Sequence, residues 1–161
     1  MTETKYRPHQ TTLERVMGAL NALPTFVLRL PFQTPMSRRL ALLTYTGRKS
    51  GRSYTIPVSY VKQGDTLLIP GGGAWHKNLE QGSPVRVRLR GSERSARSEV
   101  IKEIDEVERL VAFMMAANPA VSRFIGVPRE GDGRPNRARL EQVVRGGFAV
   151  VRLRLDSEPR P

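Results

Sequence analysis

Short runs in which apolar and polar residues alternate recur through the middle and the end of the chain. Such alternation is typical of β-strands that bury one face. Glycine-containing turns such as Gly64-Asp65 and Gly91-Ser92 separate several runs, which favours antiparallel pairing in a meander. The runs that we assign to strands are residues 40–46, 53–62, 66–69, 83–90, 95–101 and 148–155.

Other stretches repeat their apolar residues at helical spacing. Residues 105–117 carry such a stripe from Val107 to Met114, and a shorter helical piece is expected at 121–125. Residues 13–30 show the same spacing around Pro24, which interrupts it. This segment either contacts a membrane or lipid surface or packs on its own domain, and packing is the more common use of such a stripe.

These patterns predict a mainly β protein with flanking helices, an α+β fold in one domain. At 161 residues and 39% hydrophobic composition, the chain is long enough and apolar enough for a real core. We see no internal repeat. The expected organisation is an N-terminal arm with an amphipathic helix at residues 1–36, a domain at 37–156 and a tail at 157–161.

Composition narrows the classes of function. The chain has no cysteine, and its two histidines lie far apart, so we expect no metal site. No apolar run reaches the roughly 18 residues of a membrane span, and the polar N-terminus is not a signal peptide, so a cytoplasmic location is expected, with peripheral contact at the inner face of the membrane as an option. A net charge of +12 implies an anionic partner: nucleic acid, an acidic membrane or a charged small ligand.

The strongest candidate for such a contact is the loop between the first two strands, Thr44 to Arg52, which reads Thr-Tyr-Thr-Gly-Arg-Lys-Ser-Gly-Arg. It offers backbone N–H groups, hydroxyls and three cations to one anion, for which a phosphate is the obvious candidate. The glycine spacing differs from that of a nucleotide P-loop, and a strand follows it where that motif has a helix. The local chemistry fits a basic hairpin turn equally well. The candidate anion ligands are Arg48, Lys49, Ser50 and Arg52.

A second group of candidates follows the third strand. Pro70 and three glycines, Gly71, Gly72 and Gly73, would expose bare backbone on which a flat ring could lie, or they form a flexible turn. A short helix is expected at Trp75–Leu79. The only tryptophan, Trp75, is a core anchor or the wall of a ring pocket, and Asn78 bonds a ligand or caps the turn. His76 could exchange protons near neutral pH, although a lone histidine here is more often a surface residue.

The ordered set of these features resembles the deazaflavin-dependent nitroreductase family. The match is specific in Thr46–Gly51 and Trp75–Leu79 and includes Pro57 on the second strand. The resemblance implies a split β-barrel like that of FMN-binding proteins, and it implies coenzyme F-420, a deazaflavin with a phosphate and a polyglutamate tail. The roles that it implies are phosphate binding by Arg48, Lys49 and Ser50, a ring surface at Pro70–Gly73, and positions beside the ring for Trp75, Asn78 and Pro57.

The resemblance implies a reductase that passes a hydride from the reduced coenzyme to a quinone, enone or nitroaromatic acceptor. The proton would come from solvent, His76 or Tyr54. One departure matters: the family places tyrosines in the C-terminal part, whereas this chain has none after Tyr60. The alternative is therefore a non-catalytic barrel that binds F-420, FMN, haem or a fatty acid. Split barrels of this kind are often homodimers. Nucleic-acid binding ranks last, because the basic strands lack interleaved aromatic residues.

Overall fold

The computed structural model describes residues 39–80 and 82–157. The predicted arm and amphipathic helix at 1–36, including residues 13–30, and most of the predicted tail lie outside the described residues. The predicted boundary between arm and domain therefore stays a prediction. Within the described part, no helix is long and apolar enough to cross a membrane, and no three His, Cys, Asp or Glu residues gather as a metal site.

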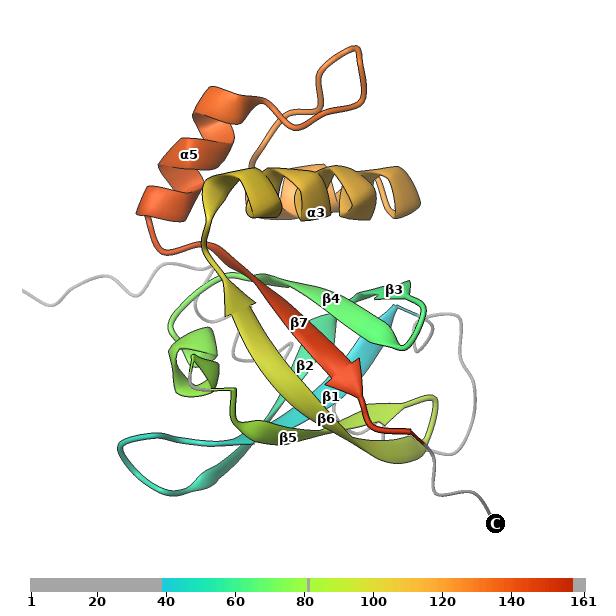
Figure 1. Cartoon of the computed structure of the whole chain (residues 1–161), viewed down its shortest axis with the longest axis vertical. Coiled ribbons are helices and arrows are strands. Elements are labelled where there is room, and N and C mark those ends of the chain that lie inside the picture. Colours follow the sequence, from blue (N-terminus) through green and yellow to red (C-terminus); the bar gives the residue numbers. More distant parts are fainter. Residues whose placement is uncertain (1–38, 81, 158–161) are drawn as a thin grey trace, which may run out of the picture.

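The described chain folds into one antiparallel sheet that curls into a barrel, with three α-helices to one side (Figure 1). This confirms the α+β class and the split β-barrel. The sheet has seven strands in the order β2-β1-β5-β6-β7-β4-β3. Their bounds are β1 Leu40–Thr46, β2 Ser53–Ser59, β3 Val61–Gln63, β4 Thr66–Gly71, β5 Pro84–Leu89, β6 Ser92–Ile101 and β7 Ala149–Leu155.

The chain changes strand partner at Tyr60. The sequence predicts one strand over 53–62, and this is wrong: β2 pairs with β1, whereas β3 pairs with β4. The Tyr60 amide donates to the Arg39 carbonyl oxygen at 3.1 Å and forms the corner. The predicted simple meander is wrong for the same reason, since β4 takes its second partner from β7 at the end of the chain. This long-range pairing curls the sheet.

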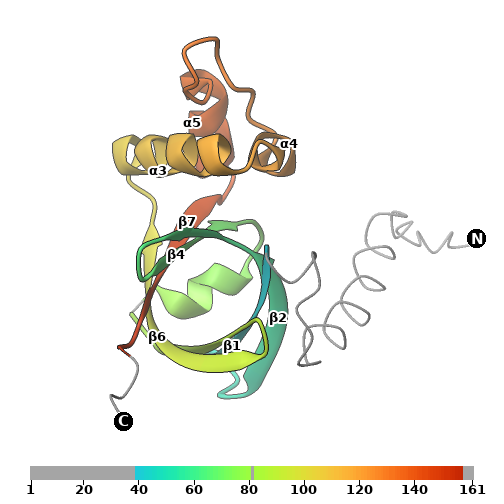
Figure 2. The ribbon, with the colours of Figure 1, turned by 90° about the vertical axis from the view of Figure 1, so that its right-hand side faces the viewer.

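A short 3₁₀ helix, η2 (Trp75–Leu79), closes one end of the barrel. Figure 2 looks along the barrel and shows η2 inside the ring of strands, while Figure 1 shows it at one end. Leu79 is fully buried in the barrel core, and Trp75 packs against that core. The remaining core residues come from alternate positions of the strands, as the sequence pattern predicts.

Three helices cover the outer face of the sheet around β4 and β7 (Figure 1). They are α3 (Ile104–Ala117), α4 (Ala120–Ile125) and α5 (Arg137–Arg145). The first begins where the Glu103 carboxylate accepts from the amides of Asp105 and Glu106. A second hydrophobic core lies between these helices and the strands. The sequence pattern does not predict α5, because five of its nine residues are charged or polar and Leu140 is its one fully buried residue.

Candidate functional site

The basic loop between β1 and β2 is held by its own backbone. The Gly47 amide donates to the Arg52 carbonyl oxygen at 2.8 Å, and the Gly51 amide donates back to the Gly47 carbonyl oxygen at 2.8 Å. Gly51 has φ +65°, a conformation that glycine adopts without steric cost. Arg52 thus closes the hairpin through its backbone, and the residues between the two glycines form the tip.

Gly47 allows the ring of Tyr54 to lie against the loop. A Cβ atom at position 47 would meet Ser50 Oγ at 2.6 Å and Tyr54 Cε2 at 2.7 Å, so no larger residue fits without displacing them. The Tyr54 hydroxyl lies 3.1 Å from Ser50 Oγ, and Ser50 Oγ also accepts from the Arg52 amide at 3.2 Å. Tyr54, on β2, therefore supports the tip of the loop.

Asn78 joins the loop to η2, although 30 residues separate it from Arg48. Its side-chain oxygen accepts from the Arg48 amide at 3.0 Å, and its amide group donates to the Trp75 carbonyl oxygen at 2.9 Å. The side chain thus uses both polar ends for contacts within the protein. Its effect is to hold the tip of the loop beside the short helix.

Loop and helix together enclose a groove of about 420 Å³. Its cationic walls are Arg48, Lys49 and Lys77, and none of the described residues that line it is acidic. Of the residues predicted for the site, the groove brings together five, Arg48, Lys49, Ser50, Tyr54 and Asn78. The other lining residues are Tyr45, Gly47, Ala74 and Lys77.

The tip of the loop also presents unused backbone donors. Among the described residues, no hydrogen bond occupies the amide N–H of Lys49 or Ser50. Two neighbouring open amides beside cationic side chains form a good environment for an oxyanion. The nearby Glu80 carboxylate is bound by Lys102, whose hydrogen bond lowers the pKa of Glu80, with a smaller contribution from the charge of Arg48. The local field is therefore positive.

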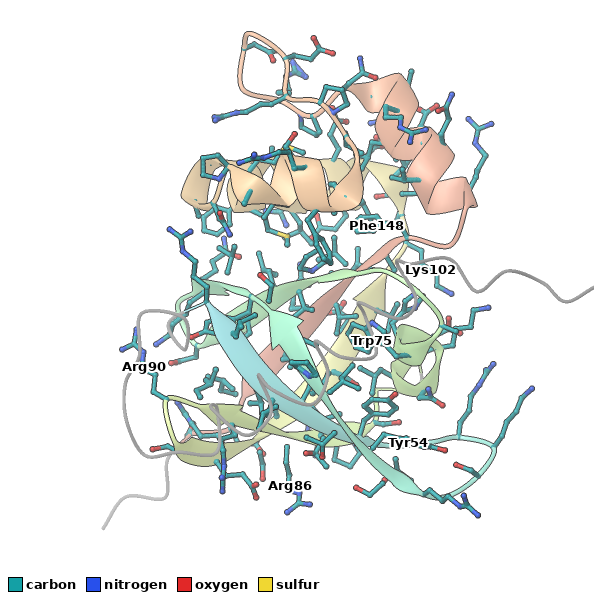
Figure 3. The ribbon with its side chains drawn as sticks, turned by 180° about the vertical axis from the view of Figure 1, so that it is seen from behind. Tyr54, Trp75, Arg86, Arg90, Lys102 and Phe148 are labelled. Carbon is teal, nitrogen blue, oxygen red and sulfur yellow. The ribbon has the colours of Figure 1, made fainter. Side chains whose placement is uncertain are left out.

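A row of aromatic rings borders the groove. The ring centroids of Tyr54 and Tyr45 lie 5.7 Å apart in a stacked arrangement, and Tyr45 is followed by Trp75 at 6.4 Å. Figure 3 shows Tyr54 and Trp75 on the same side of the barrel. Burial raises the pKa of Tyr45, and the adjacent Tyr54 raises it further, so the Tyr45 hydroxyl stays protonated. The wall is thus neutral and apolar, next to a cationic loop.

His76 is one of the two buried residues of η2, and the expectation of a surface histidine is wrong. Its side chain is 1% exposed. Nε2 lies 2.9 Å from the Gly147 carbonyl oxygen and donates to it, which leaves Nδ1 as a buried nitrogen without a partner among the described residues. The ring meets Trp75 edge-on at 6.2 Å. In this position His76 ties η2 to the start of β7, and it does not line the groove.

The other predicted residues do not line the groove. Pro70 and Gly71 are buried within β4, where they pair with Val150 and Ala149 of β7. A Cβ atom at position 71 would meet the Ala149 carbonyl oxygen at 2.8 Å. Gly72 and Gly73 are exposed and lead directly to Ala74 in the groove, and Pro57 is half-buried in β2.

Sequence reasoning missed Tyr45, Ala74 and Lys77. Tyr45 reads as an ordinary core position of a strand, because it alternates with polar neighbours. Lys77 is one of 27 lysines and arginines. Lys77 could have been predicted from its position between Trp75 and Asn78, because residues of one short helical turn lie close together.

Solved structures with the same fold share little sequence with this chain. A FAD-binding protein from Mesorhizobium loti matches at 15% identity with a TM-score of 0.52, covering 84% of this chain and 90% of that one. A structure described as a domain-swapped dimer matches at 15% identity and a TM-score of 0.52, covering 86% and 98%. An F420-H2 dependent reductase matches at 17% identity and a TM-score of 0.49, covering 72% and 94%.

The sequence itself gives a more specific result. No curated protein matches the chain closely enough to count as a relative. The family model described as F420H(2)-dependent quinone reductase matches residues 26–130, which is more than half of the 161 residues. The matched region contains the basic loop, η2 and every residue that lines the groove. The chain belongs to the F420H(2)-dependent quinone reductase family.

Proposed function

We propose that this protein is a reductase that uses reduced coenzyme F-420 and that the groove between the loop and η2 binds the coenzyme. The groove carries the proposal, because it places three cations and two open amides beside an aromatic wall. A ligand that joins a phosphate to a flat ring needs both surfaces at once. The family of the chain supports this choice of ligand.

The residues divide into two groups by chemistry. Arg48, Lys49 and the Ser50 hydroxyl would hold the phosphate, with Lys77 adding charge from the opposite wall. The exposed backbone of Gly72 and Gly73 and the half-buried Trp75 would border the ring. The bound coenzyme supplies the hydride, so the protein needs no nucleophile and supplies position and electrostatics.

We propose a quinone as the acceptor, in line with the family, with enones and nitroaromatics as further acceptors of the same electronic type. The Tyr54 hydroxyl is the only predicted proton donor that lines the groove, and it is bonded to Ser50. Tyr54 is 42% exposed, so solvent can replenish its proton. His76 is the weaker candidate of the two, because it is buried and bonded to Gly147.

We also propose a homodimer, which one similar fold described as a domain-swapped dimer supports. Light scattering on the full chain in solution measures this directly. Peripheral membrane contact through residues 13–30 stays a separate proposal, and co-sedimentation with lipid vesicles of a chain lacking that segment, compared with the full chain, tests it.

The central experiment is a titration of the protein with F-420, followed by quenching of Trp75 fluorescence and repeated with FMN. We expect tight binding of F-420, weaker binding of FMN, and reduction of menadione when the reduced coenzyme is supplied. The Arg48→Ala/Lys49→Ala double variant should lose about 100-fold in affinity, because two charge-assisted contacts disappear. The loss should be larger at low salt, where charges are less screened.

The matched control is Arg123→Ala/Arg145→Ala, which removes the same charge from exposed positions on α4 and α5. An equal loss of affinity in the control would show that net charge, and not the loop, attracts the coenzyme. Tight binding of F-420 without reduction of any acceptor would favour the binding-protein alternative. Preference for FMN would support the groove as the cofactor site but would identify FMN, and not F-420, as the cofactor.

A further inference from the structure

A second basic pocket lies at the opposite end of β1 from the groove. It has a volume of about 220 Å³, roughly half that of the groove. Arg39 directly precedes β1, whereas the groove is reached at Tyr45, near the other end of the strand, so the two sites lie about 20 Å apart along it. Figure 3 shows Arg90 on the other side of the barrel from Trp75 and Tyr54. The lining residues are Arg39, Tyr60, Val61, Lys62, Arg90, Ala117 and Asn118.

Three separate segments deliver cations to this pocket. Arg39 comes from the start of β1, Lys62 from β3 and Arg90 from the turn between β5 and β6. No described residue that lines the pocket is acidic. Within residues 39–80 and 82–157, none of the three forms an ion pair. Three like charges around one small hollow repel each other, and an anion would relieve that repulsion.

Arg90 holds an unusual backbone conformation. Its φ is +49°, the one positive value at a non-glycine residue of the described chain, and Gly91 follows with φ +86°. A turn with two positive φ values normally takes Asn or Gly at its first position, because a larger L-residue costs about 1–2 kcal/mol there. In this conformation, Arg90 lines the same pocket as Tyr60.

Tyr60 adds a fixed neutral donor. The residue is 9% exposed, and its amide bond to the Arg39 carbonyl oxygen fixes its backbone at the corner between β2 and β3. Burial raises the pKa of Tyr60, and the neighbouring Arg90 offsets only part of this rise. The hydroxyl therefore keeps its proton and can donate to an anion that enters the pocket.

We propose that this pocket is a second anion site that binds the terminal phosphate group of a phosphate monoester. Such a group carries close to two negative charges and three acceptor oxygens, which suits three cations and a hydroxyl better than a single carboxylate does. The site is independent of the F-420 groove and does not rest on its assignment. The monoester can belong to a soluble metabolite or to a lipid such as phosphatidic acid, because both present a terminal phosphate of the same charge.

Titration of the ¹⁵N-labelled full chain with inorganic phosphate tests the site by NMR. The amides of Val61 and Asn118 report on this pocket, and those of Lys49 and Ser50 report on the groove. We expect saturable shifts at Val61 and Asn118 that sodium chloride at the same ionic strength does not reproduce. Because each amide signal belongs to one residue, binding at this pocket is measured separately from binding at the groove, where phosphate is also expected to bind.

Two variants make the test sharp. Arg90→Asn removes a cation and relieves the turn, because Asn tolerates this backbone conformation. Tyr60→Phe removes only the hydroxyl. Each should raise the apparent dissociation constant at Val61 and Asn118, about tenfold or more for Arg90→Asn, while the response of Lys49 and Ser50 stays unchanged. Arg145→Gln, an equal loss of surface charge on α5, should change neither.

Phosphatidylcholine vesicles with and without phosphatidic acid then separate the two sources, because phosphatidic acid carries a terminal phosphate monoester. If the protein co-sediments only with the vesicles that contain phosphatidic acid, and Arg90→Asn abolishes this, the ligand is a lipid headgroup. A retained response to phosphate without co-sedimentation would identify a soluble phosphate ester. The proposal is overturned if chloride shifts Val61 and Asn118 equally, if only Lys49 and Ser50 respond, or if Arg90→Asn leaves the dissociation constant unchanged.

Discussion

The cations of the groove and those between the barrel and the helices have opposite surroundings. In the described part of the chain, Arg48, Lys49 and Lys77 line the groove without an acidic neighbour on its walls. By contrast, Arg152 on β7 lies between Glu99 at 2.9 Å and Glu106 at 2.7 Å, with its side chain 17% exposed. One group is available to a ligand, and the other is already neutralised.

Arg137 is another cation that carboxylates neutralise, and it has more of these partners than Arg152. It pairs with Asp105 and Glu108 of α3 and, within α5, with Glu141. The hydrogen bonds that Arg137 donates to these carboxylates, that to Glu108 above all, raise the pKa of Arg137. These pairs hold the helices to each other, as Arg152 holds α3 to β7. The net charge of +12 is therefore not spread evenly over the protein. Ion pairs neutralise many of the cations on the helical side, whereas the cations of the loop remain available.

The largest effect on stability should come from Arg152→Met. Removing one partner of a partly buried ion-pair network leaves two carboxylates without it and should lower the free energy of unfolding by about 2 kcal/mol. Affinity for F-420 should not change. Urea denaturation measures the first quantity and fluorescence titration the second. Arg154→Met is the control, since the Arg154 side chain is 70% exposed and its contact with Glu99 is long, at 3.9 Å.

Two results would contradict the view that Arg152 stabilises the fold through its ion pairs: a stability loss of equal size in Arg154→Met, or no loss in Arg152→Met. The first result would mean that charge on β7 matters irrespective of pairing. The second would mean that packing of the helices on the sheet, and not the ion pairs, holds the two parts together.

The next largest effect should come from Asn78→Ala, which changes the groove without changing its charge. Its loss frees the Arg48 amide from its 3.0 Å bond and detaches the loop from η2. We expect the dissociation constant for F-420 to rise about tenfold, because the loop must then be ordered by the ligand. Asn78→Ser is the matched variant, as its hydroxyl oxygen offers an acceptor for the Arg48 amide without adding charge. An equal loss of affinity in both variants would argue against a role in ordering.

The sequence predicts most of the sheet but not its closure. Alternation locates the strands, and the glycine-flanked cations mark the loop. The run over 53–62 is continuous in pattern, so nothing local shows that Tyr60 ends one pairing and begins another. The Asn78 bond to the loop depends on how η2 sits in the barrel, which only the folded chain defines.

The two kinds of arginine are also indistinguishable in the sequence. Arg86 on β5 and Arg152 on β7 both alternate with buried valine or leucine. Only the second meets α3, because the helices cover β4 and β7 and leave β5 uncovered. Partners that arrive from distant segments decide whether a cation is used for structure or for binding, and a strand pattern carries no information about them.

A smaller effect should appear in acid. Hydrogen bonds from Arg109 and then Arg152 lower the pKa of Glu106 from its ordinary 4.5 to about 2. A carboxylate with a lowered pKa in the folded state stabilises it above the ordinary value and loses that contribution as pH falls toward 2. The stability difference between the parent and Glu106→Gln should therefore shrink between pH 4.5 and 2. A difference that stays constant over this range would show that packing, and not charge, accounts for it.

The smallest effect should come from Arg86→Gln. It tests whether an exposed ion pair behaves like the cations of the groove or like the paired cations between the barrel and the helices. Arg86 contacts Glu93 at 3.1 Å, but the two side chains are 59% and 43% exposed, so the free energy of unfolding should change by less than about 0.5 kcal/mol. If the basic strands only steer an anionic coenzyme, the association rate should fall slightly at low salt and the dissociation rate should not change. Stopped-flow fluorescence with F-420 separates the two rates. A faster dissociation would instead mean that β5 contacts the coenzyme, most simply its polyglutamate tail, and would extend the binding surface from the groove onto the outer face of the barrel.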